Sequence, residues 1–317
     1  MTDLNTLFGA EFITNVVKKI GFSGDCKIQP IQNLWSGYGQ LCRVCVGKYS
    51  LILKLVNPPD QISHPRGWAT STGHRRKLKS YEVESHWYEH YADRAKDLHV
   101  PKFLGSGCYE GVRFLALEDL RQRGYKTLVK VDFHKIIKCV RWLAKFHRTF
   151  LQQKPTDLWK EGTYWHLATR KEELENTGDI SVKQIAEDIN ARLENAQVKT
   201  IVHGDAKLAN FMFSQGTVSA VDFQYVGGGV GVKDLAYFLS SVFKSSELFR
   251  HEREILDLYF QALSVPDVER EWRALYPFAW ADFYRFLAGW SPGHWKMHAY
   301  SETMFQNVHD ILSAEKC

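Results

Sequence analysis

The sequence has little cysteine and no long apolar run. Six cysteines among 317 residues are too few for the disulfide framework of a small secreted protein. No uninterrupted apolar stretch reaches the ~18 residues needed to span a bilayer, and the first expected helix, about residues 4–20, carries charged side chains. We therefore expect neither membrane insertion nor secretion, and a cytoplasmic location.

The net charge of the chain is also small. Lysine and arginine number 41 against 36 aspartates and glutamates, a formal net charge of +5. This mild, mixed charge is compatible with anionic ligands such as phosphates, but it does not predict a nucleic-acid surface. With 44% apolar residues the chain can bury one large core or two moderate ones. We expect a globular protein with no nucleic-acid, membrane or protein partner evident.

Strand-like and helix-like patterns divide the chain near residue 120. A β-hairpin is predicted over residues 41–56, a helix over 81–95 and a short strand over 113–120. The intervening residues 57–80, rich in Pro, Gly, Ser and basic side chains, predict a long exposed loop. Further on, apolar residues recur at helical spacing over 132–150, 163–176, 181–195, 233–262 and 269–290. We predict an α+β protein with a β-rich N-lobe (1–120) and a mainly helical C-lobe (121–317).

The segment IVHGDAKLANFMF, residues 201–213, places polar side chains directly before a strand-like run. The continuation FMFSQGTVSAVDFQ predicts a hairpin that turns at Gln-Gly, so that Phe213 pairs with Val218 and Phe211 with Ala220. The open end of this hairpin then carries the polar residues that flank it on both sides.

Oxygen-bearing side chains meet at that open end. Asn210 lies level with Asp222, and Asp205 enters the same end from the preceding loop. Two carboxylates and an amide oxygen are hard ligands of the kind that Mg²⁺ accepts together with phosphate oxygens. Each residue alone is typical of a loop, but their joint spacing predicts a metal–nucleotide site.

Lys54 stands in the middle of the strand-like run LILKLV, where a buried lysine needs a partner. On the helix that follows, Tyr81, Glu84, Tyr88 and Tyr91 share one face, which turns Glu84 inward. We predict that Glu84 pairs with Lys54 and holds its ammonium group toward phosphates. A purely structural ion pair is the alternative.

Together these motifs resemble the eukaryotic-like kinase superfamily in its small-molecule branch, which includes aminoglycoside phosphotransferases, choline kinases and, as the most similar, the ecdysteroid-kinase-like proteins. The segments that carry the resemblance are HGDAKLAN, VDFQ, LILKLV, EVESHWY, FLALEDL and LAKFH. The resemblance implies a two-lobed protein-kinase-like fold and a kinase that uses ATP and Mg²⁺ to phosphorylate a hydroxyl of a small-molecule acceptor.

The resemblance also implies roles for single residues. Asp205 would accept or orient the proton of the substrate hydroxyl, Asn210 and Asp222 would hold Mg²⁺, and Lys54 would contact the α and β phosphates. The nucleotide base would bind the backbone at the hinge, at the residues Glu118, Asp119 and Leu120.

Three segments depart from the pattern or are ambiguous. The segment WSGYGQ (35–40) offers only two glycines for the phosphate-covering loop. No Gly-Lys-Ser/Thr follows VGGGVG (226–231), which we interpret as a flexible segment without a phosphate role. Asp234 is most simply a helix N-cap, although in the resembling family the matching acid supports the catalytic loop.

Other functions remain open at this stage. The sparse glycine loop favours a nucleotide-binding pseudokinase as the alternative. A phosphoester hydrolase could use His147 and His203 with the aspartates, although a core histidine is the commoner case. A protein kinase is disfavoured, because HGD replaces His-Arg-Asp and no Ala-Pro-Glu segment follows.

The acceptor is expected to bind the helical half, where residues 271–295 are densely aromatic. Most of these aromatic residues have the spacing of a helix core. Trp290, Trp295 and Asp282 could line a pocket for an amphipathic alcohol, or for an amine through cation–π contact.

Overall fold

The structure, a computed structural model, describes residues 5–58 and 71–316. Its contacts divide the chain into two compact units, Met1–Lys126 and Thr127–Cys317. Among the described residues, no helix is both long enough and apolar enough to cross a membrane.

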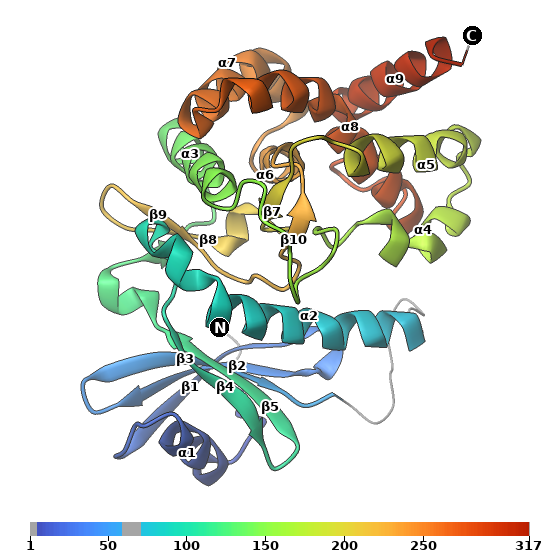
Figure 1. The fold of residues 1–317 in the computed structure, drawn as a ribbon. Helices are drawn as coiled ribbons and strands as arrows, with labels where there is room; N and C mark the ends of the chain where they lie inside the picture. Colours follow the sequence, from blue (N-terminus) through green and yellow to red (C-terminus); the bar gives the residue numbers. More distant parts are fainter. Residues whose placement is uncertain (1–4, 59–70, 317) are drawn as a thin grey trace. The chain divides into compact units, whose positions relative to one another are not determined.

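The first unit is built on an antiparallel five-stranded sheet (Figure 1). The strands follow the order β1-β2-β3-β5-β4, and β2 and β3 form the predicted hairpin, with Val46 opposite Tyr49. The elements are α1 (Ala10–Lys19), β1 (Cys26–Asn33), a 3₁₀ turn (Trp35–Gly37), β2 (Gly39–Val46), β3 (Tyr49–Val56), α2 (Ser71–His90), a 3₁₀ helix (Ala92–Leu98), β4 (Phe103–Tyr109), β5 (Val112–Glu118), a 3₁₀ turn (Leu120–Arg123) and β6 (Lys126–Thr127).

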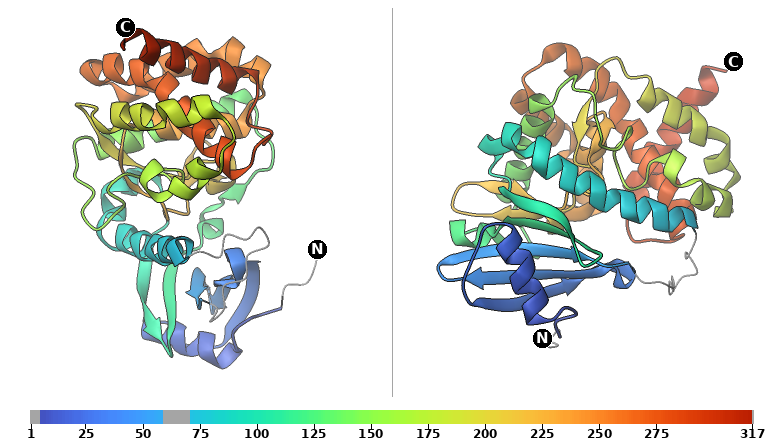
Figure 2. Two further views of the ribbon diagram at one scale, coloured as in Figure 1. Left: turned by 90° about the vertical axis from the view of Figure 1, so that its right-hand side faces the viewer. Right: turned by 60° about the horizontal axis from the view of Figure 1, so that its bottom comes forward.

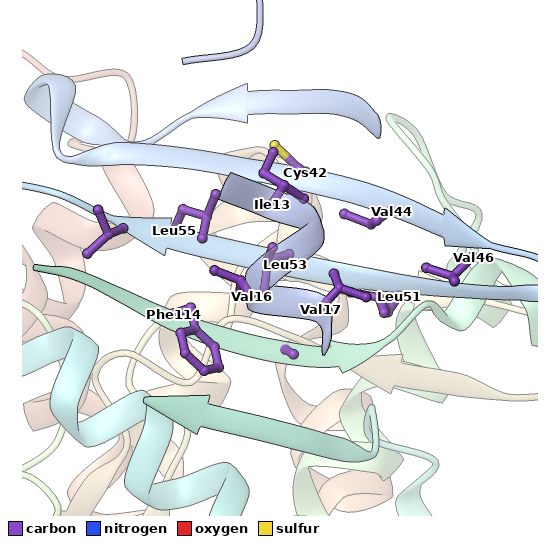
Figure 3. Close-up of a cluster of buried hydrophobic side chains, with 12 residues drawn as sticks. Ile13, Val16, Val17, Cys42, Val44, Val46, Leu51, Leu53, Leu55 and Phe114 are labelled. Atoms are coloured by element: carbon purple, nitrogen blue, oxygen red, sulfur yellow. The ribbon is translucent and has the colours of Figure 1, made fainter. Parts of the chain in front are cut away.

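The two faces of this sheet carry different side chains because side chains alternate along a strand. Leu51, Leu53 and Leu55 of β3 point to one face and form a core with Val16 and Val17 of α1 (Figure 3). Helix α2 covers the opposite face, as both views of Figure 2 show. The alternation therefore directs Lys54, which lies between Leu53 and Leu55, toward α2.

Helix α2 begins at Ser71, ten residues before the predicted start, so the prediction of a loop through residue 80 is wrong for residues 71–80. Arginine and lysine are good helix formers, and the basic run occupies the first turns of the helix. Leu78 packs against the cluster that contains Tyr38 and Tyr81, and the hydroxyl of Tyr38 is hydrogen-bonded to His74 Nδ1 at 2.6 Å. The rest of the predicted loop, residues 59–70, lies outside the described residues.

The second unit is mainly helical (Figure 1). Its elements are α3 (Phe133–Thr149), a 3₁₀ turn (Leu167–Thr169), α4 (Lys171–Asn176), α5 (Ile180–Glu194), β7 (Thr200–Val202), a 3₁₀ turn (Leu208–Asn210), β8 (Phe211–Phe213), β9 (Val218–Ala220), β10 (Gly227–Gly229), α6 (Val232–Val242), α7 (Ser245–Leu263), α8 (Pro266–Trp290) and α9 (Ala299–Ala314). The helices predicted at 132–150, 181–195 and 269–290 are confirmed as α3, α5 and α8.

Two helix predictions in this unit are wrong in extent. The segment 233–262 is two helices, because Phe243 and Lys244 are extended and Glu247 Oε2 accepts a hydrogen bond from the Lys244 backbone at 2.9 Å, which starts α7. The segment 163–176 is helical only at its end, because the backbone of Thr163 and Tyr164 donates instead to carbonyl groups of the central loops. Local periodicity does not report such long-range hydrogen bonds.

The segment VGGGVG is a buried strand, not a flexible segment. Strand β10 pairs antiparallel with β7, and its glycines are enclosed. A Cβ atom on Gly227 would lie 2.3 Å from the carbonyl oxygen of Trp159, and one on Gly228 would lie 2.6 Å from that of Lys160. The glycines therefore permit two backbone segments to pack directly against each other.

Candidate active site

The hairpin at the centre of the second unit has the predicted register. Phe213 pairs with Val218 and Phe211 with Ala220. The turn lies at Gln215–Gly216, where Gly216 has a φ of 82° and Ser214 N donates to the carbonyl of Thr217 at 3.1 Å. At the open end, Val221 N donates to the carbonyl oxygen of Asn210 at 2.9 Å. Asn210 and Asp222 are thus fixed at one end of the hairpin, as the sequence predicted.

Asp205 is the centre of a buried polar cluster at this end. Its Oδ2 atom accepts from Lys207 Nζ at 2.8 Å and from Asn210 Nδ2 at 3.0 Å. Its Oδ1 atom is also buried and accepts no hydrogen bond of normal geometry from the described residues. Burial raises the pKa of Tyr237 and an interaction with the Asp205 side chain adds to this shift, so the Tyr237 hydroxyl also lies near the carboxylate. A buried carboxylate oxygen without a donor is costly in a finished core, and it is the atom that an incoming hydroxyl group could reach.

The residues at the hairpin end fit a hydrated Mg²⁺ ion. Asn210 Nδ2 donates to both the backbone oxygen and Oδ2 of Asp205, so the Asn210 amide oxygen points away from that carboxylate and can serve as a ligand. Asp222 supplies a carboxylate one residue beyond Val221, which is paired with Asn210. Within the described parts of the chain, no group of three or more His, Cys, Asp or Glu side chains could hold a metal ion. Mg²⁺ commonly uses one or two protein oxygens and completes its shell with waters and phosphates.

Asp222 has an unusual backbone conformation, with a φ of 69°. A left-handed conformation is uncommon outside glycine and is found most often at functional loops, although aspartate tolerates it better than most residues. The position after β9 therefore combines a carboxylate with a defined, sparsely populated backbone geometry.

The His-Gly pair before Asp205 shapes the loop. Gly204 has a φ of 79°, and a Cβ atom there would lie 2.0 Å from the carbonyl oxygen of Tyr225. His203 Nε2 donates to the backbone oxygen of Val221 at 3.1 Å, and its Nδ1 accepts from Asp205 N at 3.3 Å. Burial lowers the pKa of His203, which keeps the ring neutral. Both ring nitrogens serve the backbone, so His203 joins the loop to the hairpin and is not placed as a metal ligand.

Asp234 supports this loop from α6. Its carboxylate accepts from His203 N at 2.5 Å and from Gly204 N at 2.9 Å. It also accepts from His147 Nε2 at 3.1 Å, and His147 Nδ1 is hydrogen-bonded to the Tyr259 hydroxyl at 2.7 Å. All these side chains are buried. The prediction of an N-cap is wrong, because the helix starts at Val232 and the carboxylate turns toward the preceding loop.

The predicted Lys54–Glu84 pair is confirmed in the first unit. Lys54 Nζ lies 2.6 Å from Glu84 Oε2, and both side chains are buried. Glu84 shares the inward face of α2 with Tyr81, whose ring centroid lies 5.5 Å from the same ammonium group. The pair fixes the position of the Lys54 ammonium group. This arrangement is compatible both with a phosphate-binding role and with a purely structural ion pair.

At the end of β5, the carboxylate of Asp119 is committed to internal contacts. It accepts from Arg43 Nε at 2.6 Å, Ser50 Oγ at 2.7 Å and Arg121 N at 3.1 Å. Burial raises the pKa of Asp119, but these hydrogen bonds outweigh it and hold the pKa below its ordinary value. The Asp119 side chain is thus occupied, and the contact of Glu118, Asp119 and Leu120 with a nucleotide base stays a prediction.

Comparison with known proteins shows the family to which the chain belongs. Residues 43–278 match the sequence profile of the phosphotransferase enzyme family, APH. The chain belongs to this family. No protein of curated function matches the sequence.

Solved structures of other phosphotransferases share the fold. A putative aminoglycoside phosphotransferase from Ralstonia eutropha JMP134 has a TM-score of 0.58 at 15% identity, with 96% of each chain covered. Choline kinase LicA from Streptococcus pneumoniae has a TM-score of 0.54 at 15% identity, with coverage of 96% of this chain and 98% of that one. An amicoumacin kinase solved in complex with AMP-PNP, Ca²⁺ and Ami has a TM-score of 0.54 at 16% identity, with 95% of this chain and 93% of that one covered. The phosphotransferase therefore has the protein-kinase-like α+β fold that the sequence predicted.

Sequence reasoning missed two lysines of the phosphotransferase that lie near Asp205. Lys207 pairs with Asp205, and its place two residues further along the HGDAKLAN motif was a signal that could have found it. Lys296 is buried and influenced by the charge of Asp205. It lies 91 residues further along the chain in an irregular segment, so no local pattern could have connected the two.

The acceptor pocket expected around Asp282 is not available in that form. Asp282 Oδ2 lies 3.1 Å from Lys233 Nζ, and its Oδ1 lies 2.7 Å from Arg285 Nη2. Trp165 Nε1 also donates to the carboxylate at 3.1 Å. Burial raises the pKa of Asp282, but the two cations outweigh it and lower the pKa to about 2. The carboxylate is fully used inside the core and is not free to bind an amine.

Proposed function

We propose that this phosphotransferase is a small-molecule kinase that moves the γ-phosphate of ATP to a hydroxyl group of its acceptor, with Mg²⁺ as cofactor. The observation that carries the proposal is the Asp205 cluster, in which a buried carboxylate keeps Oδ1 without a donor from the described residues while Lys207 and Asn210 hold Oδ2. A catalytic base needs this combination of a fixed position and one oxygen that no donor already engages.

In this proposal each residue has a limited task. Asp205 Oδ1 accepts the proton of the acceptor hydroxyl as the new oxygen–phosphorus bond forms and the bond from the γ-phosphorus to ADP breaks. Lys207 and Asn210 keep the carboxylate oriented. Lys54, positioned by Glu84, binds the α and β phosphates, and Asn210 and Asp222 hold Mg²⁺. The metal ion, when bound, neutralises the charge of the phosphates.

The relatives support this assignment by analogy. The amicoumacin kinase was solved with an ATP analogue and a divalent cation, and the choline kinase is named for a small alcohol. The hydrolase alternative loses its support, because His203 and His147 are both occupied by hydrogen bonds within the core.

The pseudokinase alternative rests on the segment WSGYGQ. Gly39 in this segment has a φ of 135°, and a Cβ atom there would lie 2.0 Å from the carbonyl oxygen of Leu55. This glycine is therefore required by close packing against β3, and it does not itself argue for phosphate binding. The presence of Lys54, Asp205, Asn210 and Asp222 together favours the active kinase.

Mg²⁺-dependent nucleotide binding should be visible in a thermal melt. At 100 times its dissociation constant, a nucleotide stabilises a protein by about 2.7 kcal/mol. We expect Mg·ATP to raise the melting temperature of the wild type, and Asp222→Asn to lose most of this shift because the amide is a weaker Mg²⁺ ligand than a carboxylate. ATP and GTP, each with and without Mg²⁺, are compared by differential scanning fluorimetry.

The matched control for this melt is Asp310→Asn, which removes an exposed carboxylate from α9. It should respond to Mg·ATP as the wild type does. A shift that is equal in the wild type and Asp222→Asn would show that Asp222 is not a ligand. A wild type with no response to either nucleotide would contradict the kinase proposal as a whole.

A further inference from the structure

Lys296 is a buried cation in the segment that joins α8 to α9. Only 7% of its surface is exposed. Its ammonium group lies 4.5 Å from the centroid of the Tyr237 ring, 5.4 Å from that of Phe283 and 5.4 Å from that of Trp295. Three aromatic rings around one cation give a favourable but partial substitute for water.

The backbone of this lysine is also fixed. Lys296 N donates to His294 Nδ1 at 3.2 Å, and its carbonyl oxygen accepts from Ser301 Oγ at 3.0 Å. Ser301 lies in the first turn of α9, so the helix start anchors the segment. The backbone is thus held in place before any ligand binds, and the ring contacts restrict the ammonium group, which reduces the entropic cost of binding.

No carboxylate among the described residues forms an ion pair with Lys296 Nζ. Lys233 of the same unit is similarly buried but forms an ion pair, with its ammonium group 3.1 Å from the Asp282 carboxylate. A buried ammonium group without a directly paired carboxylate is costly and is normally avoided. Lys296 therefore differs from a structural lysine of this core.

The aromatic contacts of Lys296 connect it to the loop that carries Asp205. The Tyr237 ring that contacts the Lys296 ammonium group also packs against Tyr164, with ring centroids 5.5 Å apart. Tyr164 N in turn donates to the carbonyl oxygen of Gly204, the residue before Asp205, at 3.2 Å. In the proposed function the acceptor approaches Asp205, so Lys296 is a candidate to bind the acceptor.

We propose that Lys296 binds a carboxylate group of the acceptor, so that the substrate of this kinase is a small hydroxylated carboxylic acid. This inference rests on the proposed function, because it assigns the acceptor of the same site. A single ammonium group matches a single carboxylate, and Lys207 is already paired with Asp205.

The positive charge of Lys296 disfavours an amine as the acceptor, one of the two possibilities that the aromatic residues in the sequence had suggested. The faces of Tyr237, Phe283 and Trp295 already carry an ammonium group, so a cationic acceptor would meet a like charge there. Burial lowers the pKa of Lys296 to about 7, although Asp205 opposes this shift. Near neutral pH the ammonium form is therefore present in a substantial fraction, and a bound carboxylate would increase that fraction further.

The test compares three probes that share one skeleton and differ only in charge. They are para-(hydroxymethyl)benzoate, its neutral amide and the corresponding aminomethyl benzyl alcohol, with glycerate and its amide as a smaller pair. Each is measured by thermal melt and isothermal titration with wild type, Lys296→Met and the control Lys145→Met, which changes an exposed lysine of α3. We expect at least one acid to bind the wild type more tightly than its amide, and to lose about 10- to 100-fold in affinity in Lys296→Met only.

The outcomes separate this inference from the proposed function. Lys296→Met should keep the Mg·ATP shift of the wild type, since the proposal assigns Lys296 to the acceptor and not to the nucleotide. Acids that bind no better than amides, amines that bind as well as acids, or a loss of the Mg·ATP shift in Lys296→Met would each overturn the inference. A wild type that lacks the Mg·ATP shift contradicts the kinase proposal instead, and the acid-specific binding is then judged separately.

Stability without ligand provides a second readout. If Lys296 served only the core, Lys296→Met would lower the melting temperature. If it is kept for binding, Lys296→Met should leave the melting temperature unchanged or raise it. The variant removes a buried charge that has no directly paired carboxylate, and methionine fits the aromatic surroundings without a desolvation cost. A clear decrease in the unliganded variant would overturn the inference.

Discussion

Asp205→Asn is expected to reduce acceptor-dependent ADP formation by about 10²- to 10⁴-fold, the range typical of the loss of a general base. The amide has the shape of the carboxylate but cannot take up the proton of the acceptor hydroxyl. Lys207 also loses the charge of its partner at 2.8 Å. The rate is measured by coupled ADP detection at saturating Mg·ATP, with product phosphorylation checked by mass spectrometry.

The same variant should fold as well as the wild type or better. Asp205 is 6% exposed and keeps one oxygen without a donor from the described residues, an arrangement that favours function over stability. The nucleotide-induced thermal shift should be largely retained, and the exposed variant Asp310→Asn should have normal turnover. Undiminished turnover in Asp205→Asn would show that another group acts as the base.

The framework of the fold could be predicted because it depends on local patterns. The alternation in LILKLV placed Lys54 opposite the leucines, and the pairing of β8 with β9 followed from the Gln-Gly turn. The errors arose where distant contacts decide the structure. The basic run before Tyr81 became helical because Leu78 and His74 found partners near Tyr38.

The candidate site shows the same division. Asp205, Asn210 and Asp222 are close in sequence, and a single hairpin brings them together, so their spacing alone indicated the site. The surroundings of Asp205 come from elements far apart in sequence. Neither the support from Asp234 nor the approach of Lys296 has a periodic signal, because each depends on how α6, α8 and α9 pack.

Asp234→Asn is expected to destabilise the second unit strongly. The carboxylate accepts hydrogen bonds from His203 N, Gly204 N and His147 Nε2 in a fully buried place. An asparagine would turn an N–H group toward at least one of these donors, and removal of one partner from a buried charged network costs about 3–5 kcal/mol. Urea unfolding measures the loss, and hydrogen exchange at the amides of His203 and Gly204 should report local opening.

Asp267→Asn is the matched control, because Asp267 also lies in the first turn of a helix but is exposed. Its loss should cost no more than about 1 kcal/mol of the free energy of unfolding, the usual size of a charge effect at a helix start.

Asp234→Asn should also lose activity, because the loop that positions Asp205 loses its anchor. Asp205 and Asp234 can therefore be distinguished by stability. Asp205→Asn should lose turnover and remain stable, whereas Asp234→Asn should lose both turnover and stability. A stable but inactive Asp234→Asn would instead assign this carboxylate a direct part in the chemistry.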